Sequence, residues 1–156
     1  MLLRGILLAA AVAAADQLAK WLILAKVMVP PRAVPVTFFF DLVLSWNTGI
    51  SFGLLAGNPE LGRWLFVAVA GAITVGLLAW LARVERGMLG LAIAIIIGGA
   101  VGNIIDRVRF GAVVDFLYFH LGDYDFPAFN LADSAITIGV ALILIDSLFG
   151  EGRSRK

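Results

Sequence analysis

The hydrophobic residues of this 156-residue chain gather in four long runs separated by shorter, more polar stretches. The runs cover about residues 5–24, 64–81, 88–105 and 131–148. A helix needs roughly 20 mostly apolar residues to cross the hydrocarbon core of a bilayer. The pattern therefore predicts four transmembrane helices in one integral membrane domain, residues 1–156, with connections at about 26–63 and 108–130 that emerge on the same side.

The first of these connections has a pattern of its own. Its sequence VPVTFFFDLVLSWNTG is rich in β-branched and aromatic residues and ends on a turn signal. We expect a short strand or hairpin there, close to the membrane surface. The predicted fold class is membrane all-α, a four-helix bundle with a small extracytoplasmic β-sheet.

The start of the chain allows a second interpretation. Arg4, an apolar stretch and small residues before Asp16 are also typical of a cleavable signal peptide. The apolar pattern does not stop there, however, because QLAKWLILAKVMV extends it to membrane-spanning length. We therefore expect the segment to be retained as the first transmembrane helix.

Basic residues near the ends of the runs indicate the orientation. An even number of spans puts both termini on one side, and the side richer in Lys and Arg is normally cytoplasmic. The side of the termini carries Arg4, Arg83, Arg86, Arg153, Arg155 and Lys156. The other side carries Lys26, Arg32, Arg63 and Arg109. This balance predicts cytoplasmic termini and outward-facing connections.

The composition agrees with a membrane location and removes several classes of function. The chain is 62% hydrophobic and 15% charged, with a mean hydropathy of +1.00, which is more apolar than a core of this size can bury. A net charge of +1 provides no basic field for nucleic acid. The chain has no cysteine and one histidine, His120, so thiolate chemistry and multi-histidine metal sites are excluded, and we expect no cofactor.

Two charged residues lie inside the first run. Asp16 and Lys20 are four residues apart, so they share one face of a helix. A charge near the bilayer centre costs about 2.5–3.5 kcal/mol on insertion scales, and pairing reduces that cost. We favour an ion pair that supports the bundle over a pathway for protons or ions.

The third run ends in the sequence GGAVGNIIDR. Gly98 and Gly102 have the small-xxx-small spacing of closely packed membrane helices. Asn103 and Arg107 are one turn apart and share a face, and Asp106 lies beside Arg107. Packing explains the glycines, but it does not explain three polar side chains at the outer end of the same helix.

Two further aspartates flank the second connection. Asp133 follows Asn130 by three residues, so it has the alternative role of completing a capping box, whereas Asp115 has no such role. The predicted topology places both at similar depth. Two nearby carboxylates tend to share one proton. Such a pair suits either peptide hydrolysis by an activated water or proton-coupled transport, and the sequence chemistry leaves both open.

These residues resemble the lipoprotein signal peptidase family, bacterial signal peptidase II. The resemblance rests on five blocks in order: DQLAK at 16–20, NTGISFG at 47–53, GGAVGNIIDR at 98–107, VVDF at 113–116 and FNLAD at 129–133. It covers nearly the whole chain. Ile50 and Ser51 depart from the alanines that the family often has beside the Asn-Gly turn.

The resemblance implies an aspartyl endopeptidase of the bacterial inner membrane, with its active site near the outer face. Such an enzyme cuts a prolipoprotein on the N-terminal side of a cysteine that carries diacylglycerol. Asp115 and Asp133 would form the catalytic dyad. The substrate-binding positions would be Asn47, Asn103, Arg107 and Asn130. The supporting positions would be Asp16, Lys20, Gly99, Gly102 and Asp106. The first connection would form a small sheet that cradles the substrate.

Other functions compete with this interpretation. A small proton-coupled transporter or channel would use Asp16, Asp115 and Asp133 as relay groups, yet the last two are expected near one surface. A serine protease would pair Ser45 or Ser51 with Lys20, which we expect to be committed to Asp16. A structural membrane subunit would have no activity. We expect a monomer that contacts membrane lipid and lipid-modified prolipoproteins, and no nucleic acid.

Overall fold

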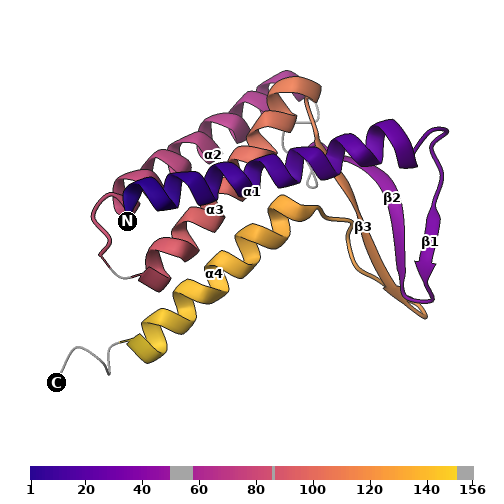
Figure 1. Ribbon diagram of the computed structural model, residues 1–156. Coiled ribbons are helices and arrows are strands. Elements are labelled where there is room, and N and C mark those ends of the chain that lie inside the picture. The colour runs from indigo at the N-terminus through magenta and orange to yellow at the C-terminus, as the bar shows by residue number, and fades with distance from the viewer. Residues whose placement is uncertain (50–57, 86, 151–156) are drawn as a thin grey trace.

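The computed structural model describes residues 1–49, 58–85 and 87–150, which form four long helices and a four-stranded sheet (Figure 1). The helices are α1 (Leu2–Leu22), α2 (Pro59–Leu81), α3 (Gly87–Phe110) and α4 (Leu131–Gly150). A short π-helix, η1 (Ile23–Val27), continues α1. The four long helices are each long and apolar enough to cross a membrane, which confirms the predicted fold class.

Helix α3 is the central helix of the bundle, because α1, α2 and α4 each pack against it. Its buried residues include Ala92, Ile93 and Ile97. By contrast, α2 buries only Gly62, Thr74 and Leu81 among its described side chains. Many of its other apolar residues are exposed, among them Leu65, Val69 and Ile73, as expected for a helix that faces lipid.

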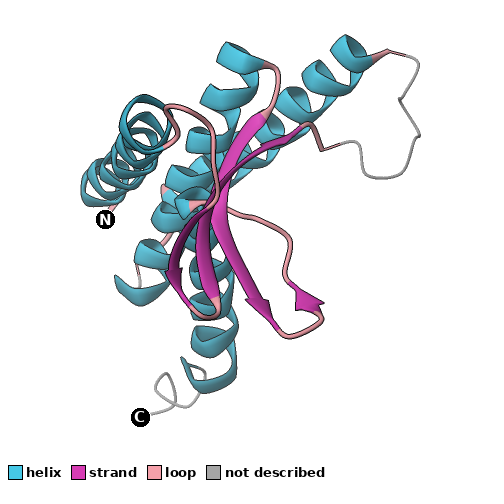
Figure 2. Cartoon of the chain, turned by 90° about the vertical axis from the view of Figure 1, so that its right-hand side faces the viewer, coloured by secondary structure: helices cyan, strands magenta, loops and turns pink. Residues whose placement is uncertain are grey.

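The sheet consists of β1 (Val34–Thr37), β2 (Phe40–Asn47), β3 (Val113–Leu121) and β4 (Tyr124–Asp125) in that spatial order. Each neighbouring pair is antiparallel. The first two strands form the expected hairpin. Figure 2 shows the sheet across one end of the bundle, and Figure 1 shows the start of α1 and the end of α4 at the opposite end.

The second connection differs from the expectation at its start and in containing a long strand. Helix α3 continues to Phe110 rather than ending near residue 105, and Arg107 therefore lies on the helix. Gly111 then takes a φ of +79°, a conformation that favours glycine, and the chain turns into β3. Asp115 thus lies on a nine-residue strand that the sequence analysis missed, although VVDFLYFHL has the β-branched and aromatic residues of a strand.

Candidate active site

Asp115 lies on β3 and is buried, with 2% of its surface exposed. Its Oδ2 accepts a hydrogen bond from Asn47 Nδ2 at 3.0 Å, and its Oδ1 accepts one from Asn130 Nδ2 at 2.6 Å. Burial raises the pKa of this carboxyl to about 6, the Asn47 hydrogen bond opposes that rise, and the charge of Asp133 adds to it. Asp115 is therefore a carboxyl group that can hold a proton near neutral pH.

Asp133 is the third residue of α4 and forms the capping box that the sequence allowed. Asn130 Oδ1 accepts from the Asp133 backbone N–H at 2.9 Å, and Asp133 Oδ2 accepts from the Asn130 backbone N–H at 3.2 Å. The capping role is thus confirmed, but it occupies only one carboxylate oxygen. The other oxygen, Oδ1, accepts from Asn103 Nδ2 at 2.8 Å.

The two aspartates are joined through the side chain and backbone of one residue, Asn130. Its side-chain amide binds Asp115 while its backbone N–H binds Asp133. Asn130 Nδ2 also donates to Asn103 Oδ1 at 3.2 Å, and Asn103 in turn donates to Asp133. Asp115 and Asp133 therefore lie in one hydrogen-bonded group, which also contains Asn103 and Asn130.

The amide of Asn103 has one orientation that satisfies its neighbours. Its Oδ1 accepts from both Lys20 Nζ, at 3.1 Å, and Asn130 Nδ2. A reversed amide would set its NH₂ group against the Lys20 ammonium and the Asn130 NH₂. Lys20 therefore helps to point the Asn103 NH₂ at Asp133.

A second set of charges lies beside this group, between α1 and α3. Lys20 Nζ is 2.8 Å from Asp16 Oδ2 and 2.7 Å from Asp106 Oδ2, and all three side chains are at most 3% exposed. The expected Asp16–Lys20 pair is present, and Asp106 completes a triad. Gln17, which the sequence analysis did not single out, donates to Asp106 Oδ1 at 2.8 Å. We call Asp16, Gln17, Lys20 and Asp106 the support network.

The support network holds the backbone immediately before each candidate catalytic residue. Asp16 Oδ1 accepts from the N–H of Ala132 at 2.9 Å, and Ala132 precedes Asp133. Asp106 Oδ2 accepts from the N–H of Val114 at 3.1 Å, and Val114 precedes Asp115. Two carboxylates on α1 and α3 thereby fix the start of α4 and the start of β3 relative to each other.

Glycines on α3 allow this close approach. A Cβ added at Gly102 would lie 2.5 Å from Asp16 Oδ2, and one added at Gly99 would lie 2.5 Å from the carbonyl oxygen of Ala132. Gly98 approaches Ala9 of α1 in the same way. The predicted packing role of the small residues is therefore supported by the neighbours that they meet.

Arg107 lies in the last turn of α3, half-buried and close to the two aspartates. Its guanidinium carbon is 5.4 Å from the ring centre of Phe66, and its Nη1 is 3.5 Å from the Asn103 carbonyl oxygen. Its Nε has no hydrogen-bond partner among the described residues. Arg107 thus has donor capacity in the site that the described residues leave unused.

Arg63 is a second residue that the sequence analysis gave no site role. Its Nε donates to the Arg107 carbonyl at 2.8 Å, and its Nη2 donates to the Val108 carbonyl at 2.7 Å. These carbonyls belong to the last turn of α3, and the Arg107 carbonyl also accepts from the Gly111 N–H at 3.0 Å, so Arg63 adds side-chain donors where few backbone donors remain. No local sequence signal links Arg63 to this turn, because it lies on another helix.

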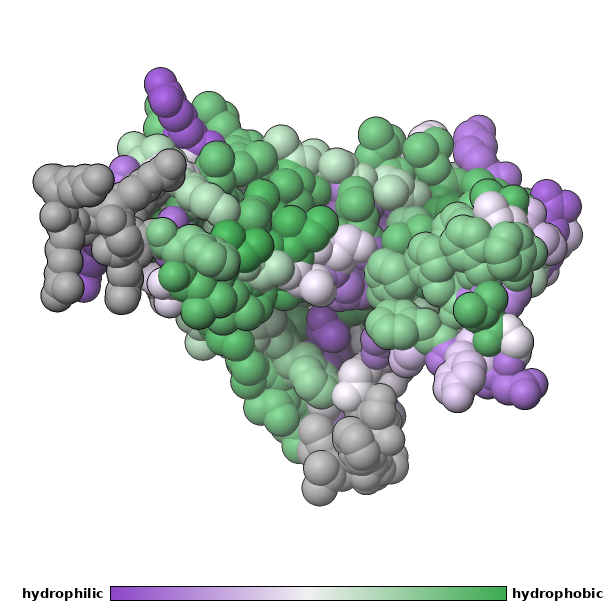
Figure 3. Space-filling model, turned by 90° about the horizontal axis from the view of Figure 1, so that it is seen from below, coloured by the Kyte–Doolittle hydropathy of each residue, from purple (hydrophilic) through white to green (hydrophobic). Residues whose placement is uncertain are grey.

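An open cavity of about 590 Å³ reaches Asp133. It is lined by Phe126, Pro127, Ala128, Phe129, Asp133, Ser134, Thr137 and Ile138. Figure 3 shows hydrophilic residues gathered in a hollow between the largely hydrophobic surfaces of the helices and the sheet. Asp133, half-buried, therefore faces space that a substrate can occupy, whereas Asp115 lies deeper. Within residues 1–49, 58–85 and 87–150, no three His, Asp or Glu side chains are arranged to hold a metal ion.

Part of the expected site lies outside the described residues. Residues 50–53 of the NTGISFG block, which include Ile50 and Ser51, are not described by the structure. Arg86, which was used for the predicted orientation, also lies outside the described residues. The described part of the block ends with Asn47, Thr48 and Gly49. There the Gly49 N–H donates to Asn47 Oδ1 at 2.9 Å, which leaves the Asn47 NH₂ free to bind Asp115.

Comparison with known proteins decides the family. The model of the family described as Signal peptidase (SPase) II matches residues 8–149. The chain belongs to the signal peptidase II family. Members of this family are peptidases, which decides between the hydrolysis and the transport that the sequence chemistry had left open. Family membership and four apolar helices also make this chain an inner-membrane protein.

Two relatives and one solved structure are similar to this protein over most of its chain. A lipoprotein signal peptidase of Azoarcus sp. (strain BH72) is 52% identical over 144 residues, covering 92% of this chain and 81% of the relative. One from Rhodopseudomonas palustris (strain TIE-1) is 46% identical over 151 residues, covering 94% and 92%. A bacterial membrane enzyme solved at 2.3 Å is 34% identical, with a TM-score of 0.79 and coverage of 98% and 92%.

Proposed function

We propose that this signal peptidase II family member removes the signal peptide from diacylglyceryl-modified prolipoproteins by means of Asp115 and Asp133. The observation that carries the proposal is the Asn130 bridge, which binds Asp115 through its side chain and Asp133 through its backbone. It holds two carboxyl groups in one site with amide donors and no direct countercharge among the described residues. Such a pair can share a proton, as an aspartic peptidase requires.

In the proposed mechanism the two aspartates have different roles. Asp133, which faces the cavity at the N-terminus of α4, is ionised and takes a proton from the attacking water. Asp115, buried and with its pKa raised to about 6, carries the proton and donates a hydrogen bond to the scissile carbonyl. The tetrahedral intermediate then collapses to acid and amine as Asp133 passes the proton that it took from water to the leaving nitrogen, and Asp115 keeps its own proton.

The polar residues around the dyad divide into two groups. We propose that Asn47, Asn103 and Asn130 hold the aspartates, because each already donates a hydrogen bond to one of them. Arg107 is the better candidate for substrate binding, because the one hydrogen bond of its guanidinium among the described residues is a long one, 3.5 Å to the Asn103 carbonyl oxygen. A guanidinium at this position can bind the backbone carbonyls of an extended peptide.

The proposed topology places the dyad at the outer face and both termini in the cytoplasm. The sheet lies at one end of the bundle in Figure 1, and the start of α1, which carries Arg4, and the end of α2, which Arg83 follows, lie at the other. A diacylglycerol anchor would hold the substrate cysteine in the plane of the outer leaflet, at the depth of the helix ends. One chain supplies both carboxyl groups and their donors, so we propose that residues 1–156 work as a single-domain monomer.

The test is cleavage of a synthetic prolipoprotein by detergent-purified protein, with and without the diacylglyceryl group on its cysteine. We expect cleavage of the lipidated form only, and its loss in the Asp115→Asn variant. Cleavage of the unlipidated form at an equal rate would contradict the substrate assignment. Full activity of the variant would remove Asp115 from the mechanism.

A further inference from the structure

The free end of the sheet has a polar face and an aromatic face. On the polar face, His120 Nε2 lies 3.3 Å from Asp41 Oδ2, and the Tyr118 ring stacks on His120 with centroids 5.5 Å apart. Tyr118 also forms a hydrogen bond with Asp125. Alternation along β3 places Phe119 and Leu121 on the opposite face, together with Asp115.

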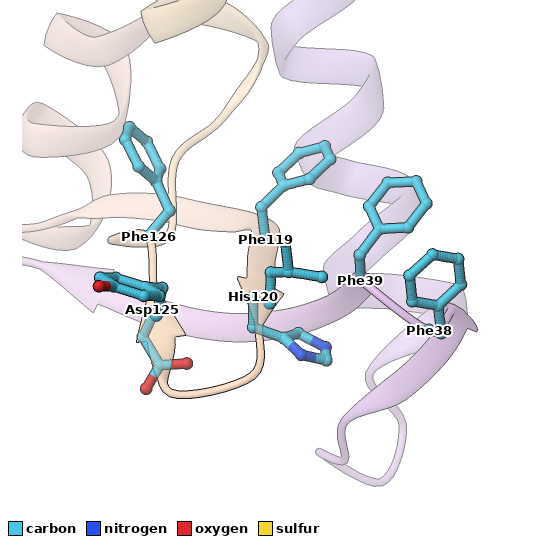
Figure 4. Close-up of a pocket in the computed structure, with 8 residues that line it drawn as sticks. Phe38, Phe39, Phe119, His120, Asp125 and Phe126 are labelled. Carbon is cyan, nitrogen blue, oxygen red and sulfur yellow. The ribbon is translucent and has the colours of Figure 1, made fainter.

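The aromatic face carries six large apolar side chains, which we call the aromatic tip: Phe38, Phe39, Phe119, Leu121, Tyr124 and Phe126. They line an open cavity of about 500 Å³. Figure 4 shows the rings of Phe38, Phe39, Phe119 and Phe126 on the side toward the helices, whereas His120 and the Asp125 carboxylate point the other way. The end of the sheet is therefore amphipathic.

The aromatic tip is much more exposed than a water-facing surface normally permits. Tyr124 is 85% exposed, Phe38 82%, Leu121 64% and Phe126 61%. Apolar patches of this kind on soluble surfaces mark a binding site for a protein or a membrane. Figure 1 shows this end of the sheet reaching past the start of α4 instead of lying over the bundle, so its helix-facing side has lipid beneath it when the helices span a membrane.

The outer ends of the helices mark the level of the membrane surface. Trp21 near the end of α1, Trp64 near the start of α2 and Phe110 at the end of α3 are all exposed, at 54%, 50% and 42%. Exposed Trp and Tyr gather at the boundary between hydrocarbon and headgroups. The aromatic tip continues this belt beyond α4, whose own first turn has no aromatic residue.

We propose that the aromatic tip is an interfacial anchor that sits in the outer leaflet of the membrane and sets the depth of the active site. The inference rests on the orientation in the proposed function. Phe119 lies four residues from Asp115 on the same face of β3, a separation of roughly 13 Å along a strand. Lipid held at the tip therefore fixes the height at which Asp115 meets a substrate that is itself anchored in the same leaflet.

The absence of cysteine makes a direct test possible, because single-cysteine variants can carry one nitroxide label each. We would label Phe38→Cys and Tyr124→Cys in full-length protein in phosphatidylcholine–phosphatidylglycerol vesicles, with Asp123→Cys as the matched control in the adjacent turn. We expect oxygen to reach the labels at 38 and 124 more readily than a water-soluble nickel chelate does, and the reverse at 123. Labels at 38 and 124 that respond like the label at 123 would overturn the proposal.

A functional readout separates the anchor from the peptidase. We expect the Phe38→Ser/Tyr124→Ser double variant to cleave a lipidated substrate in vesicles about tenfold less efficiently, mainly through KM, and to match wild type in detergent micelles. Equal cleavage in vesicles would contradict the anchor. The labels at 38 and 124 could also become accessible to oxygen only after substrate is added. That result would overturn the anchor and make the aromatic tip a binding site for the acyl chains of the substrate.

Loss of the proposed function would be recognised separately. Wild-type protein that cleaves nothing in micelles or vesicles would contradict the peptidase mechanism, whatever the labels at 38 and 124 report. Wild-type cleavage combined with water-exposed tip labels would contradict the anchor alone.

Discussion

Two pairs of aspartates lie at the sheet end of the bundle, and the chain holds them in different ways. Asp16 and Asp106 share the ammonium of Lys20 and are sealed between α1 and α3. Asp115 and Asp133 receive only amide hydrogen bonds from the described residues, and Asp133 faces a cavity. Buried carboxylates that contact a cation support structure, whereas a pair held by neutral donors can keep a shared proton available.

The two pairs also depend on each other. The paired aspartates bind the N–H groups of Ala132 and Val114, the residues just before the dyad members. Asp16 and Asp106 therefore help to fix the positions of the two proposed catalytic aspartates. Substitutions in the two pairs should consequently separate activity from stability, and the predictions below test that separation.

The largest effect should come from the dyad. We expect Asp115→Asn and Asp133→Asn each to lower kcat by about 10³-fold or more, because general acid and base groups typically contribute factors of 10²–10⁴. Asp123→Asn, in an exposed turn, is the matched control and should retain activity. Thermal unfolding in detergent should show Asp115→Asn folded. An active Asp133→Asn variant would contradict the proposed difference between the supporting and the catalytic aspartates.

Lys20→Met should act mainly on stability. It leaves two buried carboxylates without their cation, and breaking a buried ion pair typically costs about 3–5 kcal/mol. We expect a large fall in Tm, measured by thermal unfolding in detergent. Lys26→Met, at the exposed end of η1, is the matched control and should change Tm little. A Lys20→Met protein as stable as wild type would show that the triad does not support the fold.

Gly99→Ala should have a smaller effect on stability. The added methyl group meets the Ala132 carbonyl oxygen at 2.5 Å, so α3 and α4 must separate, and overpacking of this kind costs about 1–3 kcal/mol. Gly76→Ala on α2 meets nothing within 4 Å and should be neutral or slightly stabilising. Equal Tm values for the two variants would contradict the close packing.

The smallest effect should be a change in pH dependence. If Asp115 carries the catalytic proton, kcat/KM falls as pH rises through its pKa of about 6. The Asn47 hydrogen bond opposes the rise in that pKa, so Asn47→Ala should move this descending limb to higher pH. Thr37→Ala, on β1 and not paired with β3, should leave it in place. A descending limb that moves to lower pH in Asn47→Ala would contradict the assignment of the catalytic proton to Asp115.

The raised pKa of Asp115 also predicts the direction in which the stability of the folded protein changes with pH. The folded protein holds the Asp115 proton more tightly than the unfolded chain does, since burial raises the pKa from 3.8 to about 6. This stabilising contribution is present below pH 3.8 and is lost as pH rises through about 6. Asp115→Asn should remove that part of the pH dependence of Tm.

Much of the architecture could be predicted because its signals are local. Runs of apolar residues predicted four membrane-spanning helices, and β-branched residues predicted the hairpin of β1 and β2. The five motif blocks identified the family. The capping box of Asn130 and Asp133 was also readable, since both residues lie within one turn of the same helix.

Only the tertiary structure decided how the site is held together. Asp16 and Ala132 are 116 positions apart, so no local periodicity links the carboxylate on α1 to the first turn of α4. Strand β3 was missed because its first four residues are buried on both faces, so they show no alternation, and because it acquires its partner, β2, from a distant segment. The sequence indicated which residues are candidates for the chemistry. Packing of α3 against α1 and α4, through glycines that leave room for it, decided which carboxylates are paired with Lys20 and which are held only by amide donors among the described residues.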